Sequence, residues 1–264
     1  MVRNKHLFNI IGENYWPIYF AIGLFHILSG ISFTMHYIEN SKNLLICGII
    51  LLISVGLFWI WELIKESVYK GWHTRIVRNS LMKGFLLFLV SEIMLFFGFF
   101  WAFFHSALSP SIELGGVWPP YGLYTIPVYE YPLLNTCLLI TSGFSVTWVH
   151  RGIASGSYKE TIDGFLITII LGLIFVYFQV KEYYDATYNL QDGIYASSFY
   201  MLTGLHGCHV IVGVIFLIIA LISLLVNHYT TTHYLRLVFA IWYWHFVDIV
   251  WIVLFLSLYC WGSW

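Results

Sequence analysis

The stretch that most constrains the fold is residues 81–108, LMKGFLLFLVSEIMLFFGFFWAFFHSAL. Its apolar run from Gly84 to Phe104 carries one charge-capable side chain, Glu92. A helix rises about 1.5 Å per residue, so about 20 such residues cross the roughly 30 Å hydrocarbon layer of a bilayer. The run therefore predicts a transmembrane helix with an acid near its middle.

Glu92 needs shelter, because a carboxylate at that depth costs about 3 kcal/mol even on insertion scales. The side chain must be protonated, paired, or turned toward protein or water. One interpretation is a neutral acid hydrogen-bonded between helices. The other is a proton-handling group, and the residues alone leave both open.

The rest of the chain has the same apolar character. Of its 264 residues, 60% are hydrophobic and 9% are charged, which leaves too little polar surface to cover a soluble globule. We expect an integral membrane protein, with no basic tract for nucleic acid and no cleavable signal. The cysteines show no CxxC spacing and are interpreted as small buried hydrophobic residues: Cys47, Cys137, Cys208 and Cys260.

Seven apolar segments predict an all-α membrane protein with seven transmembrane helices. The first two are joined by the short polar turn HYIENSKN, so they should form an antiparallel hairpin. The predicted segments are 16–35, 44–64, 81–108, 133–149, 164–180, 197–226 and 235–259.

Loop charges predict the orientation. With the N-terminus on the inner side, every Lys and Arg except Lys42 and Lys181 falls inside, which is a strong positive-inside signal. The inner residues are Arg3, Lys5, Lys65, Lys70, Arg75, Arg78, Lys83, Arg151, Lys159 and Arg236. The acids placed outside are Glu39, Glu113, Glu130, Glu182, Asp185 and Asp192.

Two loops carry further information. The inner loop 65–80 mixes cations with Tyr69 and Trp72, which suits lipid phosphates but also ordinary topogenic charge beside an aromatic belt. The outer loop 109–132 holds every proline except Pro17, and such a loop is expected to be packed, on this chain or on a neighbouring subunit.

Two pairs of polar residues lie in the last two segments, in TGLHGCHV and WYWHFVDIVW. Residues three apart share a helix face, so His206 with His209, and His245 with Asp248, should each point one way. The HxxH pair favours interhelical hydrogen bonding over haem or metal ligation. His245 and Asp248 are interpreted as a paired, neutralised unit, with proton conduction left open.

Five blocks of the sequence resemble, in order and spacing, the subunit III family of mitochondrial cytochrome c oxidase. The likeness covers essentially the whole chain, from the WP at Trp16 to the WGS that ends at Ser263. The blocks are SEIMLFFGFFWAFFHSALSP, ELGGVWPP, PLLNT, EYYDATYNLQDGIYASSFYMLTGLHGCHVIVG and WYWHFVDIVWIVLFLSLYCWGS.

The resemblance implies an architecture and a role. A two-helix bundle (1–70) and a five-helix bundle (71–264) of one membrane domain would flank a V-shaped cleft filled with phospholipid. The chain would be a non-redox subunit of respiratory complex IV in the mitochondrial inner membrane, with its C-terminus in the intermembrane space. Haem a, haem a3 and copper would belong to partner subunits, mainly subunit I, with subunit II and accessory subunits nearby.

The resemblance also assigns site residues. Glu92 matches the family's carbodiimide-reactive acid, and Lys65, Glu66 and His73 match or adjoin its lipid head-group site. No catalytic or metal-binding residue is implied. The sequence departs from animal relatives at the end of the sixth segment, where Ser223 and Val226 replace Arg and Lys.

Two rival functions follow from the polar residues. A proton-coupled transporter would use Glu92, His206, His209 and His245 as a relay. A di-haem quinol-oxidising subunit would use the histidines as ligands. The transporter would show transport activity in liposomes as an isolated chain, whereas the favoured interpretation expects an inert polypeptide that co-purifies with haem a and copper. The di-haem subunit is distinguished by the absorbance spectrum of the separated chain.

Overall fold

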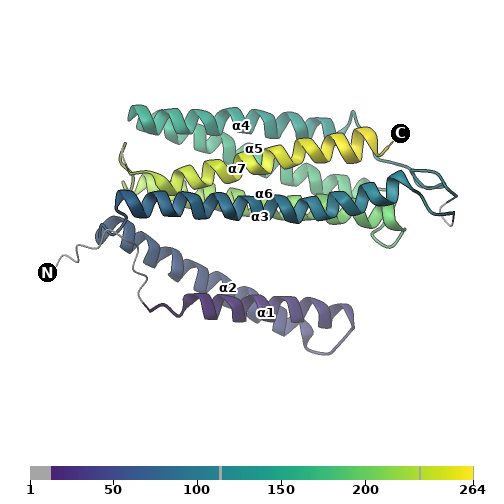
Figure 1. The fold of residues 1–264 in the computed structure, drawn as a ribbon, viewed down its shortest axis with the longest axis horizontal. Coiled ribbons are helices and arrows are strands. Elements are labelled where there is room, and N and C mark those ends of the chain that lie inside the picture. Colours follow the sequence, from purple (N-terminus) through teal and green to yellow (C-terminus); the bar gives the residue numbers. More distant parts are fainter. Residues whose placement is uncertain (1–12, 113–114, 232, 264) are drawn as a thin grey trace. The chain divides into compact units, whose positions relative to one another are not determined.

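A computed structural model describes residues 13–112, 115–231 and 233–263. Over these residues it contains seven helices long and apolar enough to cross a membrane, and its only β-structure is an isolated bridge between Thr230 and His233. The predicted fold class is confirmed. The helices are α1 Trp16–Met35, α2 Ser41–Ile64, α3 Arg75–Leu108, α4 Tyr131–Ser155, α5 Tyr158–Asp185, α6 Ile194–Leu225 and α7 Leu235–Leu254 (Figure 1).

Helix α1 has the predicted bounds, and the other helices, with their π-helical extensions, are longer than the predicted apolar segments. Two π-helical turns, Lys65–Tyr69 and Phe255–Trp261, extend α2 and α7. The predicted inner loop 65–80 was too long, because α3 already begins at Arg75. The hydroxyl of Thr74 accepts the backbone N–H of Val77 at 3.4 Å, which caps an amphipathic turn that carries no hydropathy signal. Arg3, Lys5 and Glu113, used for the orientation, lie outside the described residues.

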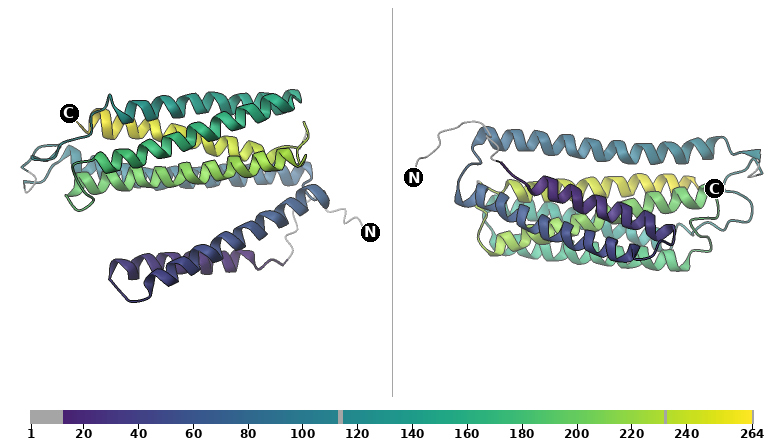
Figure 2. Two further views of the ribbon diagram at one scale, coloured as in Figure 1. Left: turned by 180° about the vertical axis from the view of Figure 1, so that it is seen from behind. Right: turned by 90° about the horizontal axis from the view of Figure 1, so that it is seen from below.

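The chain divides into two compact units, Met1–Met82 and Lys83–Trp264, and α3 begins in the first and continues in the second. In the first unit, α1 and α2 form the expected hairpin (Figure 2). Their backbones meet at glycines: a Cβ on Gly30 would lie 2.8 Å from the backbone N of Leu45, and one on Gly48 would lie 2.9 Å from the backbone N of Ile27. Small residues at the contact let two membrane helices approach closely.

Gly30→Ala should therefore destabilise the hairpin, because the added methyl meets backbone that cannot move aside. We expect a loss of about 1–3 kcal/mol, the usual cost of overpacking. The measurement is the thermal midpoint of the purified protein or complex. Gly56→Ala is the matched control, since a Cβ there meets nothing within 4 Å. Equal midpoints for the two variants would contradict the glycine contact.

In the second unit, α4 and α5 are an antiparallel pair, also in close contact. Gly152 of α4 faces Thr161, Gly164 of α5 faces Val149, and the hydroxyls of Ser145 and Thr168 are 2.7 Å apart. These contacts fix the register of the pair, and its far end is joined by the Tyr131 hydroxyl, which donates to Asp185 at 3.0 Å.

Helix α7 provides much of the buried core of this unit. Trp244 and Trp251 are fully buried, and their indole N–H groups donate to Ser142 and Thr136 of α4 at 2.9 and 3.0 Å. A Cβ on Gly172 of α5 would lie 2.6 Å from the Trp244 ring. The tryptophans thus fill space left by small residues and satisfy their single donor inside the unit.

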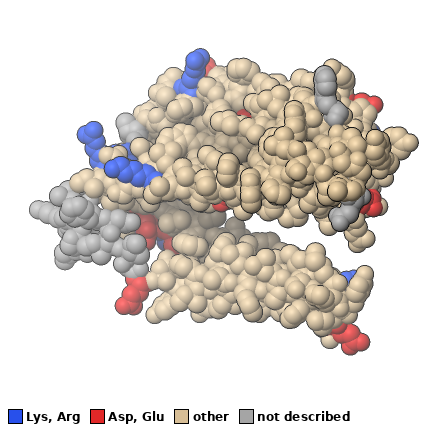
Figure 3. All heavy atoms as spheres, turned by 45° about the vertical axis from the view of Figure 1, so that its right-hand side comes forward, with Lys and Arg blue, Asp and Glu red and all other residues tan. Residues whose placement is uncertain are grey.

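Part of the proline-rich loop 109–132 packs on its own chain, which was one of the two possibilities that the sequence left open; the other was packing on a neighbouring subunit. The Trp118 ring lies 5.6 Å from Phe103 and 5.4 Å from Tyr195, and the Thr187 hydroxyl donates to the carbonyl of Tyr124 at 3.2 Å. Figure 3 shows a surface that is mostly uncharged, with Lys, Arg, Asp and Glu gathered toward the helix ends.

Candidate functional site

Helix α3 packs on the other helices of the second unit through its side chains. Its backbone makes almost no close approach to another helix. Aromatic rings fill the space. Phe85 stacks on Phe239 of α7 with centroids 4.5 Å apart, and Phe88 stacks on Tyr243 at 6.4 Å. The candidate site is the one ion pair within this aromatic layer.

Glu92 of α3 and His209 of α6 form that contact. The carboxyl Oε2 lies 2.9 Å from the imidazole Nε2, and the two side chains are 20% and 12% exposed. The other ring nitrogen, Nδ1, lies 2.8 Å from the backbone carbonyl of Leu205. Both nitrogens of His209 are therefore engaged.

These contacts restrict where protons lie. A carbonyl only accepts, so Nδ1 of His209 carries a hydrogen. In the neutral imidazole Nε2 is then an acceptor, and Glu92 must be the protonated donor; in the alternative, an imidazolium donates to a carboxylate. Both forms hold the same number of protons and have zero net charge. The pair thus avoids an isolated charge in the membrane while keeping a proton that can move between two atoms.

Aromatic rings surround the pair. The imidazole of His209 lies 5.1 Å from the Phe96 ring, 6.1 Å from Phe246 and 6.3 Å from Tyr243. These rings exclude water from most of the contact, which strengthens a hydrogen bond and raises the cost of leaving either partner unpaired.

His206 does not share the partner of His209. Its side chain is fully buried, its Nε2 donates to the backbone carbonyl of Val247 on α7 at 3.2 Å, and its ring packs on Phe175 and Trp251. The expectation that the two histidines point one way was wrong in this respect. At three residues apart they diverge enough for one to reach α7 and the other α3.

His245 and Asp248 lie within ion-pair distance on α7, with Nδ1 and Oδ2 3.9 Å apart, and His245 is 39% exposed. Nε2 of His245 lies 3.5 Å from the Thr147 hydroxyl of α4. A Cβ on Gly143 of α4 would meet Asp248 Oδ2 at 2.8 Å, so this glycine makes room for the carboxyl group. Among the described residues, no hydrogen bond joins His206 or His245 to the Glu92–His209 pair.

The residues assigned to lipid head groups lie in the first unit, around the π-helical turn that follows α2. Lys65 is exposed with its Nζ 5.6 Å from the Trp61 ring centroid, while Glu66 and His73 are half-buried. The backbone N–H of Trp72 donates to the carbonyl of Glu66 at 3.1 Å, which folds the segment back on itself.

Two acids were missed or misplaced by sequence reasoning. Glu62, at the end of α2, accepts from the Trp16 indole at 2.7 Å and ties the open end of the hairpin. Glu182 was expected in an outer loop, but α5 continues to Asp185, and Glu182 is only 1% exposed. The missed signal is the amphipathic extension of the apolar segment, VKEYYD, whose polar residues do not end the helix.

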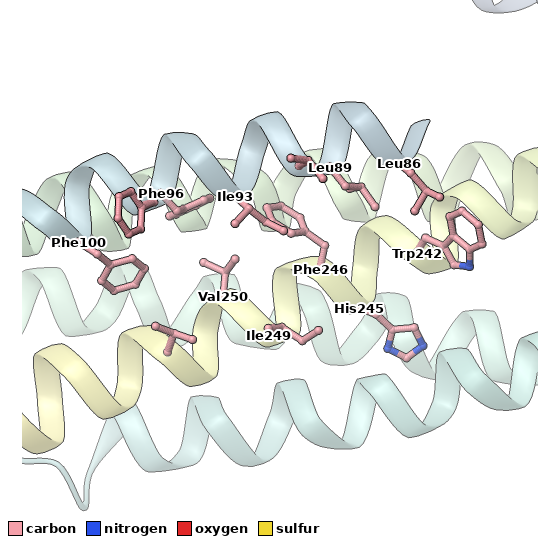
Figure 4. A pocket seen from close by; sticks show the side chains of 13 residues that line it. Leu86, Leu89, Ile93, Phe96, Phe100, Trp242, His245, Phe246, Ile249 and Val250 are labelled. Carbon is pink, nitrogen blue, oxygen red and sulfur yellow. The ribbon is translucent and has the colours of Figure 1, made fainter. Parts of the chain in front are cut away.

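A groove of about 720 Å³ lies between α3 and α7 (Figure 4). Phe246 and Val250 of α7 point across it toward α3, while His245 points away from α3. All labelled residues but His245 and Trp242 have purely hydrocarbon side chains. Such a lining suits hydrocarbon rather than a polar substrate. Over residues 13–112, 115–231 and 233–263, no group of three or more His, Cys, Asp or Glu side chains is arranged to hold a metal ion.

The fold and these contacts define a multi-pass α-helical membrane protein whose intramembrane polar side chains are engaged chiefly in contacts between helices. A family profile described as "Cytochrome c oxidase subunit III" matches residues 6–263. Proteins named "Cytochrome c oxidase subunit 3" from Latimeria chalumnae, Equus caballus and Tachyglossus aculeatus aculeatus are 43%, 42% and 41% identical over 263 residues, covering 100% of each chain. The chain belongs to the cytochrome c oxidase subunit III family, which confirms the resemblance seen in its motifs.

Glu92→Gln should leave assembly and initial turnover of the complex nearly intact. The amide has a similar volume, and its N–H can donate to Nε2 of His209 as a protonated acid does. Glu92→Leu is the contrasting variant, because it leaves that nitrogen without a partner in an aromatic setting, at about 1–3 kcal/mol. Assembled complex and first-cycle oxygen consumption are the measurements. Complete loss of the first turnovers in Glu92→Gln would contradict this expectation.

Proposed function

We propose that this chain is a non-redox core subunit of mitochondrial cytochrome c oxidase. In this role it stabilises subunit I, holds structural phospholipid and assists proton uptake, while subunits I and II carry haem a, haem a3, copper and the catalytic centre. The observation that carries the proposal is the full-length match to relatives named as subunit 3 of this oxidase. The engaged ring nitrogens of His209 support it, because they leave this histidine no free donor atom for a cofactor.

We place the chain in the inner membrane with its N-terminus in the matrix. In the second unit, the end of α4 meets the start of α7, where the His150 and Tyr234 rings are 6.1 Å apart. The Tyr158 hydroxyl, at the start of α5, donates to the Leu224 carbonyl near the end of α6 at 3.5 Å. Arg151, Lys159 and Arg236 thus share one end of this unit, which supports that end as the inner one.

Native electrophoresis of the solubilised membrane tests the function. The chain should migrate in a large complex that contains haem a and copper, and the separated polypeptide should have no haem absorbance. Liposomes containing the purified chain alone should show no proton-coupled transport. Migration away from haem a, or transport by the isolated chain, would contradict the proposal.

The proposed lipid role makes a separate prediction. Replacing Lys65 and His73 by Gln together should lower the phospholipid that co-purifies with the complex and shorten its active lifetime, because two near-surface groups that can be cationic contribute about 1 kcal/mol each to a lipid phosphate contact. Lys42→Gln is the control, since this exposed lysine lies at the opposite end of α2. Unchanged lipid content in the double variant counts against the head-group assignment.

A further inference from the structure

A second buried polar cluster lies in the second unit, where α4 begins and α5 ends. Glu182 and Gln179 of α5, Asn135 of α4 and Tyr259 beyond α7 are each at most 4% exposed. The Tyr259 hydroxyl donates to Oε1 of Glu182 at 2.6 Å. The cluster is separate from the Glu92–His209 pair, and the family motifs assign it no role.

The register of α4 and α5 brings Asn135 close to the level of Gln179, with Glu182 one helical turn further along α5. Val149 faces Gly164 and Ser145 contacts Thr168, so Asn135, two heptads before Val149, lies opposite Phe178, two heptads after Gly164. Glu182 lies two heptads after Thr168, so Asn135 and Glu182 continue the faces through which the helices touch. Thr136, next to Asn135, accepts the indole N–H of Trp251, whose ring lies 5.9 Å from Tyr259.

Several atoms of this cluster are buried without a hydrogen-bond partner among the described residues. They are Oε2 of Glu182 and both side-chain polar atoms of Gln179 and Asn135. Buried polar groups are almost always hydrogen-bonded to protein or ordered water, because each unsatisfied group costs about 1–3 kcal/mol. Unpaired buried donors and acceptors on neighbouring turns of α4 and α5 are the polar partners that a bound water requires.

Glu182 also has no cation beside it. Over the described residues, no Lys, Arg or His nitrogen lies within 4.0 Å of its carboxyl group. An ionised Glu182 would be a buried charge without a cation, which accepts a hydrogen bond from Tyr259 and lies beside the Gln179 amide, and this is more costly than a neutral acid. The phenol of Tyr188, in the segment after α5, packs on the same Phe199 ring as Tyr259, with centroids 5.5 and 5.6 Å away. Burial raises the pKa of Tyr188 well above the usual range, and its hydroxyl has no hydrogen-bond partner among the described residues.

We propose that Glu182 is a proton-binding site held as a neutral carboxylic acid, and that it shares ordered water with Gln179 and Asn135 between α4 and α5. Oε1 accepts the Tyr259 hydroxyl, and Oε2 carries the proton and donates it to water. The amide oxygens of Gln179 and Asn135 accept from that water. The ligands are thus a proton and water, and their binding involves no redox step.

Infrared difference spectroscopy of the intact membrane complex, labelled with 13C-glutamate, tests the proton. The spectrum should contain a carbonyl-stretch band of a protonated glutamic acid at neutral pH that shifts in D2O and is lost in Glu182→Gln. Glu160→Gln, an exposed position on the same helix, should retain it. Loss of a carboxylate band in Glu182→Gln, with no change in the acid band, would overturn the proposal.

Two further variants test the hydrogen bonds and keep the inference falsifiable where Glu182→Gln does not assemble. Tyr259→Phe removes one donor to Oε1, so it should shift the acid band without abolishing it. Asn135→Leu removes the α4 partner and should shift the band because the shared water is disturbed. A band unchanged in Asn135→Leu contradicts the water, and a band unchanged in Tyr259→Phe contradicts its assignment to Glu182.

Discussion

The hydrogen bond between Glu92 and His209 is the directional constraint on how α3 packs within the second unit. Helix α3 is held off from its neighbours by phenylalanine rings, so this contact is the one directional interaction described between α3 and α6. A membrane gives helices little hydrophobic reason to associate, which leaves packing and hydrogen bonds to fix them. The contact works because the carboxyl and imidazole groups are neutral as a pair in either proton arrangement.

Two other helix pairs, α1 with α2 and α4 with α5, pack differently. In them, glycine or small hydroxyl residues let the two backbones approach closely. Gly30 and Gly48 join the hairpin, and Gly152 and Gly164 join α4 to α5. In these contacts the backbones lie close together, and in the α4–α5 pair the hydroxyls of Ser145 and Thr168 hydrogen-bond to each other. The aromatic packing of α3 on α7 is looser and borders the apolar groove between these two helices.

Hydropathy predicted the seven spans, because a bilayer demands about 20 apolar residues for each one. It also showed that Glu92 needed a partner. The identity of His209, 117 residues away, was not predictable, since apolarity on every face leaves the rotation of each helix undefined. Glu182 was misplaced for a related reason: a helix end is marked by backbone bonds, which continue past the last apolar residue.

A double-mutant cycle on Glu92 and His209 tests most directly whether one net-neutral contact joins α3 to α6. Glu92→Leu, His209→Leu and the double variant are compared by thermal midpoint of the purified complex. We expect the loss of stability in the double variant to be smaller than the sum of the two single losses, with a coupling of about 1 kcal/mol. Strictly additive losses would show that the two side chains act independently and would contradict the account.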